Sequence, residues 1–396
     1  MIIEYIGKKE EAEIISSIKS NGLDGDLSLI GDPSQNILIE GDNLKALKSL
    51  VFDYNLKGKI DLIYIDPPFA TNTTFTIDSD SDRVSTISNA KNGVLAYSDK
   101  LKGGEFIEFL RERLVLLKML LSEQGSIYLH IDYKIGHYVK IAMDEIFGIQ
   151  NFRNDITRVK CNPKNFARKG YSNIKDLILF YSKSNDLIWN EPSIGYTSED
   201  IERLYKKIDT DGRRYTTVPV HAPGETKNGN SSQEWMGSFP PKGRHWRCST
   251  DILDQWQKAG LIEWSSNGVP RKKIYPEDSQ GKRVQDIWEF KDPQYPTYPT
   301  EKNSNLLDLI IKTSSNENSI VLDCFCGSGT TLNAAQNNNR KWIGIDQSPE
   351  AIKATIKKVC TNEKDLFKKT NYTHLKVKEQ EQLKRKIKTK IELETI

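Results

Sequence analysis

The sequence has few cysteines and no long run of apolar residues, and both shortages narrow what the protein can be. Its 396 residues include five cysteines, an odd number, and none of them forms a Cys-x-x-Cys pair. This pattern argues against a disulfide framework and a zinc ribbon, and no metal site is expected. No stretch reaches about 18 apolar residues, as a membrane-spanning helix would, and the first residues lack the apolar core of a signal peptide. We therefore expect a cytoplasmic protein with reduced thiols and no membrane contact.

The charge is nearly balanced overall but unevenly distributed. The formal net charge is +3, yet residues 352–396 contain thirteen Lys and Arg against six Asp and Glu. A basic segment of this kind could contact a polyanion, and the alternative is a solvated charged helix.

The hydrophobic pattern divides the chain into three zones. In residues 36–150 and again after 296, short apolar runs alternate with stretches of helical period, which is typical of a parallel sheet with crossover helices. Residues 151–295 lose this rhythm and are rich in Gly, Pro, Asn, Trp and basic residues, which predicts irregular structure with short strands. The simplest arrangement is one doubly wound α/β domain interrupted by an inserted domain. The predicted segments are an N-terminal helical arm (1–35), the first α/β half (36–150), the insert (151–295), the second α/β half (296–350) and a basic helical extension (351–396).

A glycine-containing turn between a strand and a helix lies near the carboxyl end of the chain. In "VLDCFCGSGTT" the strand ends at Asp323, the turn contains Gly327 and Gly329, and a helix begins near Thr330. The spacing lacks the third glycine of a dinucleotide fingerprint and the Gly-Lys-Thr of a P-loop. Asp346 ends the next predicted strand, where an acid can accept hydrogen bonds from ribose hydroxyls. Together these residues indicate a nucleoside-bearing cofactor without a pyrophosphate.

A second motif follows an apolar strand in the first half of the chain. The strand in "DLIYIDPPF" runs directly into Asp66, Pro67, Pro68 and Phe69. This motif, followed far downstream by "VLDCFCGSGTTLNAA" and "WIGID", resembles the bacterial site-specific DNA amino-methyltransferases in their circularly permuted β arrangement, including type II enzymes and type III modification subunits. The resemblance covers roughly residues 36–350. It implies a Rossmann-like methyltransferase fold of class I, with an inserted irregular α+β target-recognition domain.

The resemblance implies S-adenosylmethionine as the methyl donor and gives the four residues of the second motif a chemical role. An exocyclic amino nitrogen is a poor nucleophile because its lone pair is delocalised into the ring. The carboxylate of Asp66 and the carbonyl of Pro67 would accept its two hydrogens and aim the lone pair at the methyl group. Proline suits this position because it offers a rigid carbonyl and no N–H. Phe69 would stack on the flipped base, which contributes about 1–3 kcal/mol.

Further cofactor contacts are expected from the same resemblance. Asp42 would lie near the adenine of the cofactor, although an Asx turn capping the next helix is the competing interpretation. Thr300 and Lys302 would lie near the methionine carboxylate, against the alternative of helix capping. His130 and Asp132 in "LHID" end a strand that is expected to face the same cleft, and a structural histidine is favoured there over a catalytic one. The cofactor-binding set is Asp42, Thr300, Lys302, Asp323, Phe325, Gly327, Gly329, Thr330 and Asp346.

The start of the insert has the composition of a DNA-contacting surface. Residues 158–175 contain six basic residues and no acid, interleaved with Phe166 and Tyr171. Phosphate contacts position a duplex and base-edge contacts specify it, so sequence preference is expected in residues 213–283. The predicted phosphate contacts are Arg158, Lys160, Lys164, Arg168 and Lys169.

These observations predict a DNA methyltransferase acting on adenine N6 within a specific duplex sequence, from a bacterial restriction-modification system. Cytosine N4 is the alternative target, but the resemblance favours adenine because the motif begins with Asp66. Two hypotheses from different functional classes are a non-catalytic DNA-recognition subunit of a nuclease complex and a methyltransferase acting on a protein glutamine. Candidate partners are duplex DNA, a cognate restriction endonuclease subunit and a second copy of the chain, in an enzyme located in the cytoplasm at the nucleoid.

Overall fold

The computed structural model describes most of the chain as two compact units. It describes residues 2–17, 23–24, 35–68, 74–77, 94–98, 103–162, 169–226, 229–294, 301–361 and 372–378. The larger unit consists of Met1–Glu191 and Gln285–Ile396, and the smaller unit is Pro192–Val284. Each unit is described below by itself.

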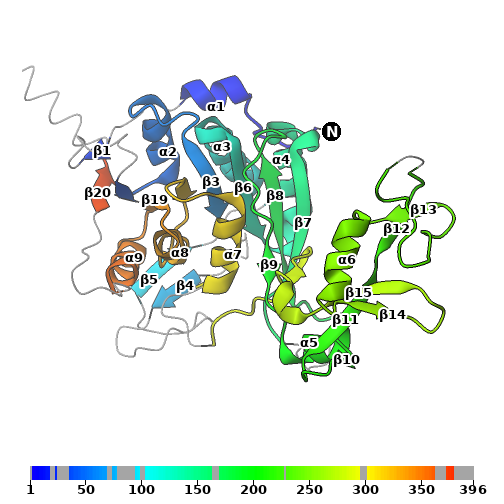
Figure 1. The fold of residues 1–396 in the computed structure, drawn as a ribbon. Helices are drawn as coiled ribbons and strands as arrows, with labels where there is room; N and C mark the ends of the chain where they lie inside the picture. Colours follow the sequence, from blue (N-terminus) through cyan, green and yellow to red (C-terminus); the bar gives the residue numbers. More distant parts are fainter. Residues whose placement is uncertain are drawn as a thin grey trace, which may run out of the picture. The chain divides into compact units, whose positions relative to one another are not determined.

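A mainly parallel sheet forms the centre of the larger unit (Figure 1). Its strands lie in the order β1-β20-β2-β19-β18-β3-β6-β8-β7-β17. Strands β20 through β6 are parallel, and β8 is antiparallel to both of its neighbours. The strands are β1 (Leu23–Asp24), β20 (Tyr372–Val377), β2 (Asn36–Glu40), β19 (Lys341–Asp346), β18 (Ile320–Asp323), β3 (Ile60–Ile65), β6 (Leu121–Ile131), β8 (Lys175–Ser182), β7 (Phe152–Val159) and β17 (Ile287–Trp288).

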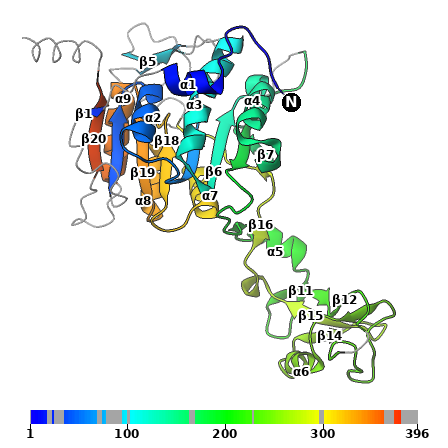
Figure 2. The ribbon, with the colours of Figure 1, turned by 90° about the horizontal axis from the view of Figure 1, so that it is seen from above.

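Helices cover both faces of this sheet (Figures 1 and 2). On one face α2 (Asn43–Phe52), α3 (Gly103–Leu120) and α4 (Tyr133–Phe147) pack side by side, with α1 (Glu11–Ser17) against α3. On the other face α7 (Ser304–Ser314), α8 (Thr330–Asn337) and α9 (Pro349–Thr361) follow one another. The central strands are buried on both faces, which explains why "IDLIYI" and "IVLD" are almost continuously apolar. Elsewhere in this unit lie the hairpin of β4 (Thr74–Ile77) and β5 (Val94–Ser98) and a 3₁₀ turn at Ile149–Asn151.

The connections of the sheet reverse direction between β18 and β3. These two strands are parallel neighbours, with Val321 opposite Leu62 and Leu322 opposite Ile63. From β18 the chain crosses through α8 to β19 on one side, whereas from β3 it crosses through α3 to β6 on the other side. Open α/β sheets bind ligands outside the carboxyl ends of the strands at such a reversal. The predicted doubly wound α/β fold is therefore confirmed, and its topology places the expected site at the ends of β18 and β3.

The smaller unit is built from short strands around a tryptophan-rich core. Its core contains Val220, Trp235, Trp246, Leu253 and Ile262, and Trp235 stacks on Trp264 at 5.5 Å between ring centroids. Its elements are β9 (Ser193–Ile194), α5 (Ser198–Leu204), β10 (Lys207–Ile208), β11 (Arg214–Pro219), β12 (His221–Pro223), β13 (Arg244–Trp246), α6 (Thr250–Lys258), β14 (Ile262–Trp264), β15 (Pro270–Ile274), a 3₁₀ turn (Pro276–Asp278) and β16 (Lys282–Arg283).

Two features of the organisation differ from those expected from the sequence: the limits of the insert and the secondary structure of the carboxyl extension. The smaller unit spans Pro192–Val284, not 151–295, because β7 and β8 pair with each other and β8 pairs with β6 in the large sheet. The carboxyl extension is not helical throughout, because Tyr372–Val377 forms β20 beside β2. Within β20, Thr373 and Leu375 are buried while His374 and Lys376 are exposed, which is the alternation of a strand. Within the described ranges, no helix has both the length and the apolarity needed to cross a bilayer.

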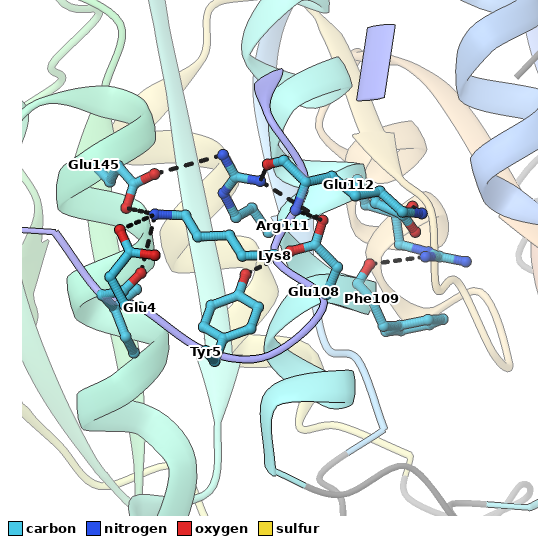
Figure 3. A network of polar contacts seen from close by, with 11 residues as sticks. Glu4, Tyr5, Lys8, Glu108, Phe109, Arg111, Glu112 and Glu145 are labelled. Carbon is cyan, nitrogen blue, oxygen red and sulfur yellow. Dashed lines mark hydrogen bonds and ion pairs between the residues drawn. The ribbon is translucent and has the colours of Figure 1, made fainter. Parts of the chain in front are cut away.

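The N-terminal segment is attached to α3 and α4 by a partly buried polar network (Figure 3). The Tyr5 hydroxyl donates to Glu108 at 2.5 Å, and Lys8 donates to Glu145 at 3.0 Å. Arg111, which is buried, donates to the carbonyl of Lys9 and lies 3.5 Å from Glu145. Arg111 therefore compensates carboxylates on two helices and also holds the N-terminal backbone.

We expect Arg111→Met to lower the free energy of unfolding by about 3 kcal/mol, because removing one partner leaves buried acids uncompensated. Urea denaturation followed by circular dichroism measures this loss. Lys353→Met is the control, because Lys353 is exposed and forms its ion pair with Glu350 at the surface of α9. This variant should change the free energy of unfolding by less than about 0.5 kcal/mol. Equal losses in the two variants would contradict a special role of Arg111.

Candidate active site

Asp66 follows the last residue of β3 and has an unusual set of partners. Its side chain is 16% exposed, and Oδ2 forms an ion pair with Lys302 Nζ at 2.7 Å. Oδ1 is buried and accepts no hydrogen bond from any group in the described part of the chain. An unsatisfied buried acceptor costs about 1–3 kcal/mol, and such groups in native structures call for an explanation. The site therefore offers a carboxylate oxygen that an incoming N–H donor can use.

The turn after β18 is fixed from inside by Asp323. Its Oδ1 accepts from the backbone N–H of Phe325 at 3.0 Å, and its Oδ2 accepts from the Thr331 hydroxyl at 2.6 Å. Burial raises the pKa of Asp323 to about 7, against the lowering effect of these hydrogen bonds. Gly327 and Gly329 have φ of +51° and +76°, which only glycine adopts without strain. The turn leads directly into Thr330, the first residue of α8.

Asp346 ends β19 and connects two neighbouring turns. Its carboxylate accepts from the backbone N–H groups of Gly327 and Ser348, each at 2.9 Å. Burial raises the pKa of Asp346 above its usual value, although these two hydrogen bonds favour the charged form. The carbonyl of Asp346 also accepts from Gly41 N at 2.9 Å, which brings the end of β2 alongside. Asp42 accepts from Lys45 N at 3.0 Å as the N-cap of α2, so the structure contains the capping contact that competed with a cofactor contact in the sequence analysis.

Several residues that the sequence analysis did not single out support this site. Asn43 donates to the Cys324 carbonyl at 2.8 Å and accepts from Arg113 Nε at 2.7 Å. The Arg113 guanidinium lies 3.6 Å from the ring centre of Phe109, which contacts Phe325. The Asp-Asn pair at the end of β2 was the available signal for Asn43, but nothing local in the sequence indicates Arg113.

Lys358 of α9 is a further such residue and holds the glycine turn from the opposite side. It donates to the hydroxyls of Ser328 at 3.1 Å and Thr330 at 3.0 Å, and it forms an ion pair with Glu301. Glu301 precedes Lys302, so the segment carrying Lys302 is tied to α9. Lys302 itself contacts the Asp66 carboxylate, and the expected contact with the cofactor carboxylate stays a prediction.

The predicted DNA-contacting residues have different positions. Arg158 is fully buried, where it donates to the carbonyl of Phe290 at 2.8 Å and pairs with Asp292. Arg158 therefore cannot contact a phosphate backbone, and this prediction was wrong. Along the second half of β7 buried and partly exposed positions alternate, and Arg158 occupies a buried one, whereas its basic sequence surroundings had suggested an exposed charge. Lys160 is 24% exposed and pairs with Asp176, and Lys169 is exposed. Four predicted residues lie outside the described residues, namely Phe69, Thr300, Lys164 and Arg168.

The site thus places three carboxylates at the ends of β3, β18 and β19, beside a glycine turn. A family model described as DNA methylase matches residues 60–358. The chain belongs to this family. The type II methyltransferase M.EcaI of Enterobacter cloacae is 38% identical to this DNA methylase over 365 residues, covering 90% of the chain and 77% of M.EcaI. The EcoP15I Mod subunit of Escherichia coli, a type III restriction-modification enzyme, is 26% identical over 376 residues, covering 78% of the chain and 57% of the Mod subunit.

The DNA methylase thus spans about three quarters of M.EcaI and little more than half of the EcoP15I Mod subunit. A solved structure titled as the M1.HpyAVI-SAM complex matches with 18% identity and a TM-score of 0.40, covering 81% of this chain and 98% of that one. Family membership confirms the predicted class of enzyme, a methyltransferase with S-adenosylmethionine as its donor.

Gly329→Ala should weaken S-adenosylmethionine binding about tenfold, because strained left-handed residues cost about 1–3 kcal/mol and the turn would shift. A Cβ at Gly329 would lie 2.8 Å from Thr355 Oγ1, so the backbone cannot simply accept it. Isothermal titration calorimetry measures the affinity. Gly58→Ala is the matched control, because Gly58 has φ of +70° but open space around its Cβ position. Equal cofactor affinity in the two variants would contradict a role of the glycine turn in cofactor binding.

Proposed function

We propose that this DNA methylase transfers a methyl group from S-adenosylmethionine to the N6 amino group of a flipped adenine within a specific duplex sequence. The proposal rests on one observation. Asp66 lies where the sheet connections reverse, and its buried Oδ1 accepts no hydrogen bond from the described residues. The sequence Asp66-Pro67-Pro68 supports adenine over cytosine N4, since the cytosine-specific enzymes of the family that the sequence resembles more often have serine at the first position.

The geometry suits an amino group that must be made nucleophilic. Asp66 Oδ1 would accept one N–H of the amino group, and the carbonyl of Pro67 would accept the other. Two acceptors fixed on a rigid backbone favour a pyramidal nitrogen whose lone pair points out of the ring plane. Pro67 is buried and Pro68 is half-buried, so this part of the backbone has little freedom to move. Stacking of the base on Phe69 remains a prediction.

The residues at the strand ends fit a cationic, nucleoside-bearing donor. Asp66, Asp323 and Asp346 end three neighbouring parallel strands and make this edge of the sheet acidic. The described cations beside them, Lys302 and Lys358, are each already paired with a carboxylate. Such a site favours a positive sulfonium over a diphosphate. S-adenosylmethionine supplies the methyl group when bound; Asp346 would hold the ribose hydroxyls, while Gly327, Gly329 and Thr330 would line the methionine part.

We further propose that the chain is the modification component of a restriction-modification system. Relatives of both type II and type III support this role, and the Mod subunits among them favour a restriction subunit as partner. A homodimer is a further proposal. The smaller unit, Pro192–Val284, is proposed to read the DNA sequence, with Lys169 and the predicted Lys164 and Arg168 contacting phosphates from the larger unit.

We expect Asp66→Ala to retain S-adenosylmethionine binding within about threefold and to lower methyl transfer by at least about 100-fold, because only the transition state uses this carboxylate fully. Calorimetry measures binding, and transfer of tritiated methyl groups to unmethylated bacterial DNA measures activity.

Asp61→Ala is the control for this experiment, because Asp61 lies near the other end of β3 and accepts from Ser122 and Ile320. It should retain methyl transfer. Full activity of the Asp66 variant would remove Asp66 from the mechanism, and inactivity of the unmodified chain on every DNA tested would refute the proposed function itself.

A further inference from the structure

A chain of buried polar side chains lies behind Asp66 and crosses three strands. The Tyr64 hydroxyl of β3 lies 2.9 Å from Nδ1 of His130 in β6. Nε2 of His130 lies 3.3 Å from Oδ2 of Asp176 in β8, and Oδ1 of Asp176 accepts from Lys160 at 2.6 Å. Tyr64, His130 and Asp176 are all buried, whereas Lys160 is partly exposed. The chain thus leads from the active site toward solvent.

Stability alone gives little reason for this arrangement. Burying charged and polar groups is unfavourable unless they are well paired, and apolar residues of similar size are often at least as stabilising. The neighbours of these residues on the same strands are apolar, including Ile63, Leu129 and Leu177. Tyr64, His130 and Asp176 form a connected set of buried polar side chains, with the buried Arg158 3.8 Å from Asp176 and the partly exposed Lys160 at its end, and this connection points to a use in the reaction.

The contacts define the protonation of His130. Burial by itself would raise the pKa of Asp176, but the hydrogen bond from His130 and the ammonium of Lys160 hold the pKa well below its usual value. An ionised Asp176 accepts from Nε2–H, which leaves Nδ1 as the acceptor for the Tyr64 hydroxyl. Burial lowers the pKa of His130, so the imidazole is neutral near pH 7.

The neutral nitrogen faces the active-site carboxylate. His130 Nδ1 lies 3.8 Å from Asp66 Oδ1, the oxygen that has no hydrogen-bond partner in the described part of the chain. A side-chain shift of about 1 Å would bring the two atoms within hydrogen-bond distance. The charged and titratable groups around His130 are Tyr64, Asp66, Arg158, Asp176 and Lys302.

We propose that His130, held by Asp176, receives the proton that methyl transfer displaces from the adenine nitrogen, with Asp66 as the intermediate carrier. This inference rests on the proposed function. The nitrogen lone pair forms the N–C bond while the C–S bond breaks and its electron pair stays on sulfur, which leaves the nitrogen positive with two hydrogens. As positive charge develops on the nitrogen during the transfer, one of its protons passes to Asp66 Oδ1 and from there to His130 Nδ1, so the rate of transfer depends on His130.

The remaining steps return His130 to its neutral form. Protonated Nδ1 donates to the oxygen of Tyr64, since a hydroxyl can also accept. Asp176 stays ionised and keeps accepting from Nε2–H, and after the methylated base has left, Nδ1 gives its proton back through Asp66 Oδ1 to water, which restores the starting tautomer. One proton leaves for each methyl group transferred, so the sequence is balanced without another reactant.

The test compares His130→Gln with unmodified enzyme in single-turnover methylation of unmethylated bacterial DNA, across pH 5 to 9. The glutamine amide can still donate to Asp176, but it offers no basic nitrogen. We expect a rate loss of about 100-fold at pH 7, as is typical of losing a general base. We also expect loss of the fall in rate on the acid side that protonation of His130 causes in the unmodified enzyme, which should lie below the usual pKa of histidine because burial lowers the pKa of His130. Asp176→Asn should give the same change in the pH profile.

Controls separate this role from a structural one. His137→Gln alters an exposed histidine of α4 and should leave the profile unchanged. Thermal unfolding and cofactor calorimetry of each variant show whether the fold and the cofactor site are retained. A rate loss with an unchanged pH profile, or full activity of His130→Gln, would overturn the proposal. If Asp66→Ala is inactive while His130→Gln is fully active, the relay fails and the proposed function stands.

Discussion

The parallel pairing of β18 with β3 is the constraint on which the rest of the structure depends. These strands come from opposite ends of the chain, yet their register places Asp323 next to the segment that leads into Asp66. Because the two crossovers leave this pair in opposite directions, neither of them covers the strand ends, and a ligand can approach there. The smaller unit is inserted after β8, and the chain returns from it to the same sheet, where β17 pairs with β7 at one edge and β18 pairs with β3 at the centre.

The three carboxylates at this edge are compensated in different ways, and the difference indicates which of them meets the substrate. Asp323 and Asp346 receive hydrogen bonds from the protein on both carboxylate oxygens, so they shape the turns around them. Asp66 receives the ammonium of Lys302 on one oxygen only, and its other oxygen faces the buried His130. A fold optimised for stability alone would satisfy that oxygen as well.

Local sequence was sufficient to predict the α/β fold. It also predicted that Asp66, the glycine turn and Asp346 lie at strand ends, because each of them follows or ends an apolar run. It was insufficient where pairing between distant segments decides the outcome. Arg158 lies in a basic stretch, but β7 pairs with β8 and β17, so its side chain is buried against Asp292. The polar partners of His130, Tyr64 and Asp176, come from two other strands, β3 and β8, and no spacing within one strand could have indicated that they meet.

The central claim is that Asp66 directs methyl transfer to the amino group of adenine. Single-molecule sequencing of DNA from a methylation-deficient bacterial strain expressing this chain tests the claim most directly, because it identifies the modified base and its sequence context together. We expect N6-methyladenine at one defined sequence and at no other. N4-methylcytosine, or DNA without any modified base, would contradict it.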